Sequence, residues 1–245
     1  MQMKKHILVK TGYDYFKKNK GFVHFVKNEQ DNIFLNDLKN NSHAFVLSCL
    51  MDRQYSSDKA WMIAIRLKEI LGDFSMEVLS SISLEQYKNL FITNKLHRFN
   101  ETMAEVFYEG VQLIHSKYND KAFKIWENSP SSATVVLRFL EFPGCGIKIA
   151  TMATNILARQ FKIKFSDYNS IDVSPDTHVK RVMYRLGLVS KDADANEIIY
   201  KAREMNPEFP GIIDSPLWDI GRNVCKASSC DCDNCVLQDE CNYAR

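Results

Sequence analysis

Residues 142–150 read Phe-Pro-Gly-Cys-Gly-Ile-Lys-Ile-Ala and separate two apolar segments with helical spacing, residues 135–140 and 149–157. The two glycines allow the backbone to turn tightly, and the amides that open the second helix point outward at its positive end. Such a helix-hairpin-helix can dock a DNA phosphate without reading the base sequence. An ordinary helical hairpin with a glycine-rich turn has the same pattern, so this stretch alone leaves both interpretations open.

The composition predicts a compact globular protein. The chain has 245 residues, of which 45% are hydrophobic and 11% aromatic. Its longest apolar runs fall short of the roughly 20 residues that span a bilayer, and its basic start lacks a secretory apolar region. We therefore expect no membrane association and a cytoplasmic, nucleoid-associated location.

Basic charge is concentrated in two blocks, although the net charge is only +2. Residues 1–28 hold seven Lys against one acid, and residues 138–191 hold nine Lys or Arg against four acids. Either block could be a solvated helix face or a contact for a polyanion.

The distribution of Pro and of apolar residues predicts an all-α fold. All six Pro lie at or beyond Pro130, and stripes with helical spacing occur at residues 45–50, 61–70 and 103–114. Ser83 followed by Gln86 resembles a capping box, and the loop at 128–132 leads into a further helix.

Five of the seven cysteines crowd into the last 21 residues, where large apolar side chains are few. An odd number of cysteines without a secretory signal favours reduced thiols or metal ligation over disulfides. Four of these cysteines have the spacing Cys225-x6-Cys232-x2-Cys235-x5-Cys241, and four thiolates suit tetrahedral zinc.

Residues 171–182 contain a second candidate site. Asp176, followed by Thr177 and His178 and then by apolar residues at helical spacing, has the pattern of a helix N-cap. A carboxylate fixed at a helix start is also suited to stabilising a developing positive charge. Asp172 is a nearby competitor that lacks the Thr-His context.

Together these motifs resemble the endonuclease III branch of the helix-hairpin-helix DNA glycosylase superfamily. The family hairpin reads Leu-Pro-Gly-Val-Gly-Arg-Lys-Thr-Ala, and this chain keeps Pro143, Gly144, Gly146, Lys148 and Ala150 in register. The resemblance implies that Lys148 is the catalytic Lys, with a phosphate-binding Lys as the alternative. It also implies that Gly144 and Gly146 contact DNA.

Two further segments carry the resemblance. Residues 175–182 resemble the family's Val-Asp-Thr-His-x-x-Arg-Val, which implies that Asp176 is the catalytic Asp and that His178 lies at the DNA. Residues 50–58 resemble Leu-Leu-Ser-Ala-Gln-Ala-Thr-Asp, which makes Gln54 the candidate that fills the space left by an extruded nucleotide. Leu96 and His97 are weaker candidates for a loop that would wedge into the DNA duplex. A core Leu beside a surface His is the simpler interpretation of this pair.

The cysteine pattern resembles the family's cluster loop. The resemblance implies a [4Fe-4S] cluster with Cys225, Cys232, Cys235 and Cys241 as ligands. Residues 217–222, which precede the first of these cysteines, also resemble the family sequence at that place. Cys230 departs from the pattern, and it either replaces Cys232 as a ligand or remains a free thiol.

The family fold has two lobes, a six-helix barrel expected at 35–165 and a second lobe formed by 1–34 and 166–245. The implied partner is double-stranded DNA with a damaged or mismatched base, lying between the lobes and bound by a monomer. Lys148 would attack C1′ of the flipped nucleotide, and the Schiff base would permit β-elimination. A base-releasing enzyme with Asp-activated water and a non-catalytic DNA-binding protein are the alternatives, and the excised base is not readable from the sequence.

Overall fold

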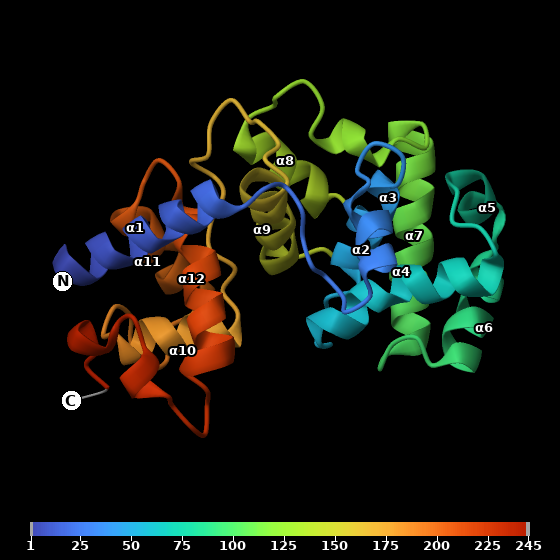
Figure 1. Cartoon of the computed structure of the whole chain (residues 1–245). Coiled ribbons are helices and arrows are strands. Elements are labelled where there is room, and N and C mark those ends of the chain that lie inside the picture. Colours follow the sequence, from blue (N-terminus) through green and yellow to red (C-terminus); the bar gives the residue numbers. More distant parts are fainter. Residues whose placement is uncertain (1, 244–245) are drawn as a thin grey trace. The chain divides into compact units, whose positions relative to one another are not determined.

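The computed structural model describes residues 2–243, with side chains from residue 6 onward. This part of the chain holds twelve α-helices and no β-strand apart from one isolated bridge between Cys225 and Cys230 (Figure 1). The predicted all-α fold is confirmed. None of the helices in this range is both long enough and apolar enough to cross a membrane.

The chain divides into two compact units. We call residues 22–128 and 137–153 the hairpin unit, and residues 1–21, 129–136 and 154–245 the cysteine unit. These borders differ from the lobe boundaries expected at residues 35 and 165, which stay a prediction.

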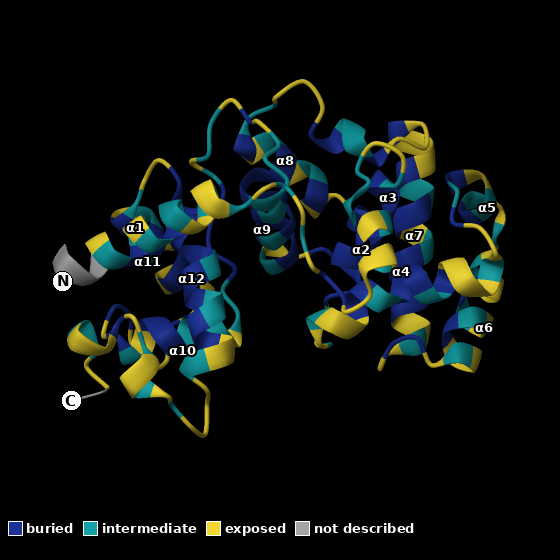
Figure 2. Cartoon of the chain, viewed as in Figure 1, coloured by how far each residue is buried: buried dark blue, intermediate teal, exposed yellow. Residues whose placement is uncertain are grey.

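The hairpin unit is built around a helix that is buried on all sides. Each of the nine residues of α3 is buried, as is typical of a central helix, and α3 packs on α4 and α7 (Figure 2). Phe45 of α3 lies beside the rings of Trp61 and Trp126. The helices of this unit that precede the hairpin are α2 (Glu29–Asn36), α3 (Ser42–Leu50), α4 (Ser57–Leu71), α5 (Met76–Ser81), α6 (Leu84–Asn94) and α7 (Asn100–Tyr118).

Two details of these helices follow from local sequence. The capping box at α6 is confirmed, because the Ser83 hydroxyl accepts from the Gln86 amide and the Gln86 side chain accepts from the Ser83 amide. The predicted stripe at 61–70 is buried except at Ile70, which is 41% exposed near the end of α4.

The cysteine unit gathers segments that are far apart in sequence. Helix α1 (Gln2–Lys18) packs on α12 (Asp214–Asp219) and on the 3-10 turn Pro210–Ile213. Helix α10 (Thr177–Arg185) also packs on α12, and α11 (Ala195–Met205) packs on the same turn. A π-helical turn, Ile156–Gln160, continues α9 into this unit.

Candidate functional site

The sequence 142–150 forms the expected hairpin between α8 (Ser132–Leu140) and α9 (Ile147–Asn155). The turn is closed by backbone bonds from Phe142 to the Phe139 carbonyl and from Cys145 to the Phe142 carbonyl, at 3.1 and 3.0 Å. At the start of helix α9, the Ile149 and Ala150 amides both donate to the Gly146 carbonyl at 3.0 Å. The amides that precede them have no partner within the helix and remain available to an anion.

The two hairpin glycines have different roles. Gly144 has φ of +75°, and a Cβ there would lie 2.9 Å from Cγ2 of Val106, so both backbone and packing require glycine. A Cβ on Gly146 would meet nothing within 4 Å. Gly146 therefore faces open space, where a phosphate can approach the start of α9.

Lys148, in the first turn of α9, forms an ion pair with Asp52. Its Nζ lies 2.5 Å from Oδ2 of Asp52 and 3.3 Å from the Asp52 carbonyl oxygen. The Asp52 side chain is 9% exposed and the Lys148 side chain is 38% exposed. The Lys148 side chain is therefore partly exposed to solvent, while the carboxylate that holds its amine is almost fully buried in the hairpin unit.

Sequence reasoning missed Asp52, although it lies in the segment quoted for Gln54. The feature that could have identified Asp52 is the position of an acid two residues after the end of the apolar helix α3. Buried acids need a partner, and Lys148 is that partner. In the hairpin, burial raises the pKa of the Cys145 thiol to about 12, so this thiol stays protonated.

Gln54 and His97 differ in exposure. Gln54 is exposed, has φ of +50°, and accepts a hydrogen bond on its carbonyl oxygen from Arg98 at 3.3 Å. His97 is 2% exposed and lies between the rings of Tyr55 and Phe99, so the interpretation as a surface His is wrong. Because His97 packs in an aromatic group, burial lowers its pKa.

Asp176 is the N-cap of α10, in the cysteine unit. Its Oδ1 accepts from the Val179 amide at 2.8 Å, which confirms the predicted cap. His178, two residues further on, contacts Arg181 through Nδ1 at 3.0 Å and lies edge-on to the Trp218 ring. Both oxygens of the competitor Asp172 accept from Arg203 at 2.8 Å, so its carboxylate is engaged in a structural ion pair.

The C-terminal cysteines gather around one small pocket. All five of them line it: Cys225, Cys230, Cys232, Cys235 and Cys241. Each is half-buried, and from Arg222 to Tyr243 only Leu237 is buried. In the described residues no three Cys, His, Asp or Glu side chains converge as ligands of a single ion would.

Arg185 of α10 anchors this segment. Its Nη1 donates to Sγ of Cys225 at 3.2 Å, to Sγ of Cys230 at 2.9 Å, and to the Lys226 carbonyl at 2.8 Å. Its guanidinium also lies 4.3 Å from the Tyr243 ring centroid. Burial raises the pKa of the Cys225 thiol, and the hydrogen bond and charge of Arg185 act in the opposite direction.

Comparison with known proteins gives a consistent result, although no protein-family model matches the chain. Endonuclease III of Rickettsia felis is 25% identical over 195 residues, covering 77% of this chain and 84% of the relative. Endonuclease III of Sulfolobus acidocaldarius is 24% identical over 213 residues, covering 83% and 82%.

Solved structures show the same fold. A trapped covalent intermediate of endonuclease III with DNA aligns with a TM-score of 0.66 at 17% identity, covering 100% of this chain and 97% of that one. A thermostable thymine-DNA glycosylase aligns with a TM-score of 0.65 at 13% identity, covering 99% and 97%. At these identities the alignments establish the two-lobed helix-hairpin-helix fold and not a substrate.

Proposed function

Because this chain is endonuclease III-like in sequence and fold, we propose that it is a DNA glycosylase of base excision repair with AP lyase activity. The observation that carries the proposal is Lys148, a solvent-accessible amine in the first turn of the second hairpin helix, held by a buried carboxylate. Similarity to endonuclease III over 77% of the chain supports it. The proposed partner is double-stranded DNA that contains a damaged or mismatched base.

DNA binding is assigned to the hairpin and its surroundings. A backbone phosphate lies at the start of α9, where Gly146 leaves open space. Gln54, exposed and in a left-handed conformation, is proposed to occupy the space of the extruded nucleotide. His178 is proposed as a further contact. Such contacts offset the few kcal/mol that base extrusion costs.

Lys148 is the proposed nucleophile. Asp52 accepts a proton from the Lys148 ammonium, since its Oδ2 is within hydrogen-bond reach at 2.5 Å. The neutral amine then forms a bond to C1′ while the bond from C1′ to the base breaks, and the electron pair leaves on the base. The base takes a proton from solvent, and Asp52 returns its proton to solvent, so the proton count balances.

Asp176 is the proposed stabiliser of the positive charge that develops on the sugar. Its carboxylate already accepts from the Val179 amide, which fixes its direction. We expect Asp176→Asn to abolish base release while DNA binding stays intact or tightens, because a negative charge near phosphate is removed. Loss of binding in parallel with base release would contradict this role.

The cysteine pocket is proposed to hold a [4Fe-4S] cluster on Cys225, Cys232, Cys235 and Cys241. Four thiolates could also hold one zinc ion. The similarity of the chain to endonuclease III and the spacing of its cysteines, which resembles the family's cluster loop, favour the cluster. When bound, the cluster would order a segment that has almost no apolar core, and no step above passes through it.

A base-releasing enzyme without lyase activity is the second candidate. The observation that favours it is the same ion pair, because an amine occupied by Asp52 must be released before it can attack. A panel of duplexes, each with one defined lesion or an abasic site, tests the proposed function. We expect base release from at least one lesion together with cleavage of the abasic strand, and activity on no duplex would contradict the proposal.

A further inference from the structure

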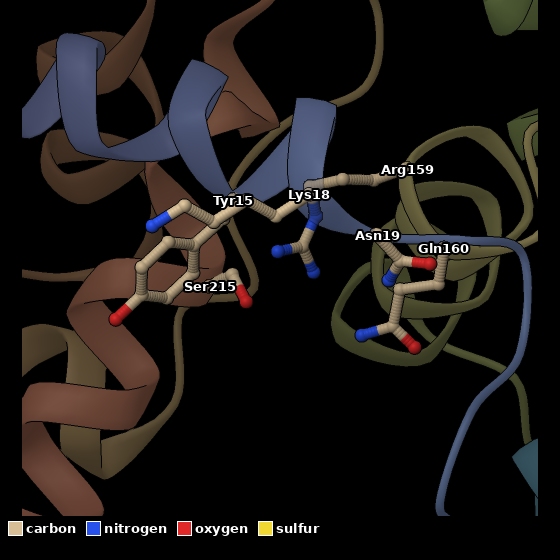
Figure 3. Close-up of a pocket in the computed structure, with 6 residues that line it drawn as sticks. All are labelled: Tyr15, Lys18, Asn19, Arg159, Gln160 and Ser215. Atoms are coloured by element: carbon tan, nitrogen blue, oxygen red, sulfur yellow. The ribbon is translucent and has the colours of Figure 1, made fainter.

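A second pocket lies within the cysteine unit, and neither the hairpin nor the cysteines contribute to it (Figure 3). Three elements meet there: the end of α1, the π-helical turn after α9, and the first turn of α12. Each of the residues that line it carries a polar group: Tyr15, Lys18, Asn19, Arg159, Gln160 and Ser215.

Arg159 is the central feature of this pocket. The residue is only 5% exposed, and in Figure 3 its side chain reaches from the π-helical turn toward the middle of the lining residues. Its Nε donates to Oδ1 of Asn155 at 3.2 Å, and Asn155 is itself held by the Gly211 carbonyl at 3.0 Å. The guanidinium is therefore fixed in orientation. Its two Nη groups have no hydrogen-bond partner among the described residues.

The charge of Arg159 is incompletely compensated. Burial lowers the pKa of its guanidinium, and Asp214 acts in the opposite direction. The Asp214 carboxylate also accepts from the Ser174 amide at 2.6 Å, so it is shared. Two basic residues, Arg159 and Lys18, line the pocket and no acid is among its lining residues, while the hydroxyl of the lining Tyr15 donates to Asp219 at 3.1 Å.

A buried polar group without a partner is costly, and a natural protein rarely keeps one unless a ligand or water satisfies it. The Nη groups of Arg159 point into the pocket, where a ligand or water can accept their hydrogen bonds (Figure 3). Arginine presents a planar fork that matches oxyanions in a bidentate manner. Lys18 and Ser215 add an ammonium and a hydroxyl from two other elements.

We propose that this pocket binds a phosphate group, with Arg159 as its fork and Lys18 and Ser215 as further donors. A tetrahedral phosphate offers acceptors in three directions and carries up to two charges, which fits donors that arrive from three elements. A planar carboxylate would leave one of these directions empty. The proposal stands independently of the glycosylase assignment, because none of the residues proposed for catalysis lines the pocket.

The test is a calorimetric titration of the full-length protein with inorganic phosphate at constant ionic strength. We expect saturable binding by the wild type, a dissociation constant about tenfold higher in Lys18→Gln, and no measurable binding in Arg159→Gln. Lys17→Gln is the matched control, since Lys17 is an exposed neighbour on α1 that does not line the pocket, and it should bind like the wild type.

Arg159 is buried, so thermal melting accompanies each titration, and Lys18→Gln decides the result if Arg159→Gln does not fold. Failure of the wild type to bind phosphate at millimolar concentration would overturn the proposal. So would equal affinity in the wild type and Lys18→Gln, which would indicate binding elsewhere.

The phosphate group can belong to a small molecule or to the DNA backbone, and a second titration separates these sources. For a backbone phosphate, Lys18→Gln weakens binding of an undamaged duplex, and inorganic phosphate competes with that duplex. For a small-molecule phosphate, Lys18→Gln binds the duplex like the wild type while its affinity for inorganic phosphate falls. Each of these results supports the proposed chemistry.

Discussion

The hairpin and the C-terminal cysteine segment are held in opposite ways. In the hairpin, Phe142, Cys145, Ile149 and Ala150 are buried, and the Phe142 ring stacks parallel to that of Tyr118. From Arg222 to Tyr243, the only buried residue is Leu237, and Val236 is 68% exposed. Figure 2 shows this exposure along the end of the chain.

The difference indicates what orders each region. The hairpin is fixed by apolar contacts and by the conformation of Gly144, so the polypeptide alone determines the position of Lys148. The cysteine segment buries little apolar surface, and in our proposal the bound cluster supplies the stabilisation that packing does not. The two regions should therefore respond differently to loss of metal and to loss of packing.

The largest expected effect is removal of a proposed cluster ligand. We expect the purified wild type to contain about four irons and to absorb broadly in the visible range. Cys235→Ser should lose both and expose the last residues to proteases, while the hairpin unit keeps its helicity. Iron analysis, absorption and limited proteolysis measure this.

Cys230→Ser is the matched variant, because Cys230 lines the same pocket and is not among the proposed ligands. It should keep its iron. Loss of iron in Cys230→Ser with retention in Cys232→Ser would show that the ligand set is wrong.

The next effect concerns the chemistry of the hairpin unit. Asp52→Asn removes the proposed proton acceptor, and general bases contribute about 10²-fold or more to such steps. The rate of covalent trapping on an abasic duplex should fall by that factor, and Asp52→Glu should recover part of it.

Glu105→Gln is the control for Asp52→Asn, since it breaks the Lys88–Glu105 ion pair, whose atoms lie 2.6 Å apart in the same unit. It should be trapped at the wild-type rate. Equal trapping of Asp52→Asn and the wild type would reduce Asp52 to a structural partner of Lys148.

The smallest expected effect is a difference in stability between variants of the two hairpin glycines. Gly144→Ala places a methyl group in a left-handed conformation and against Val106, and should cost about 2–4 kcal/mol of stability. Gly146→Ala meets no neighbour and should cost about 1 kcal/mol or less. Urea unfolding measures both, and similar losses would contradict the different roles of the two glycines.

Local features of the sequence were sufficient to predict the hairpin, two helix caps and the fold class. The hairpin, the Asp176 cap and the Ser83 capping box depend on residues within a few positions of each other, and all three form as expected. The all-α fold follows from helical spacing and from the late position of the prolines.

What depends on long-range packing was not predictable. The pairing of Lys148 with Asp52 joins residues 96 positions apart, and no pattern in either segment specifies it. Arg159 counts toward a basic block in the sequence, yet in the fold it is buried beside the end of α1. His97 was misjudged for the same reason, because its aromatic neighbour Tyr55 comes from a different segment.

The central claim is that Lys148 is the nucleophile, and borohydride trapping tests it most directly. The wild type is incubated with a duplex that carries one abasic site, borohydride is added during turnover, and the covalent protein–DNA product is resolved by denaturing electrophoresis. We expect a trapped product for the wild type and none for Lys148→Gln, with both proteins binding the duplex. A wild type that cannot be trapped, or a Lys148→Gln variant that is trapped equally well, would contradict it.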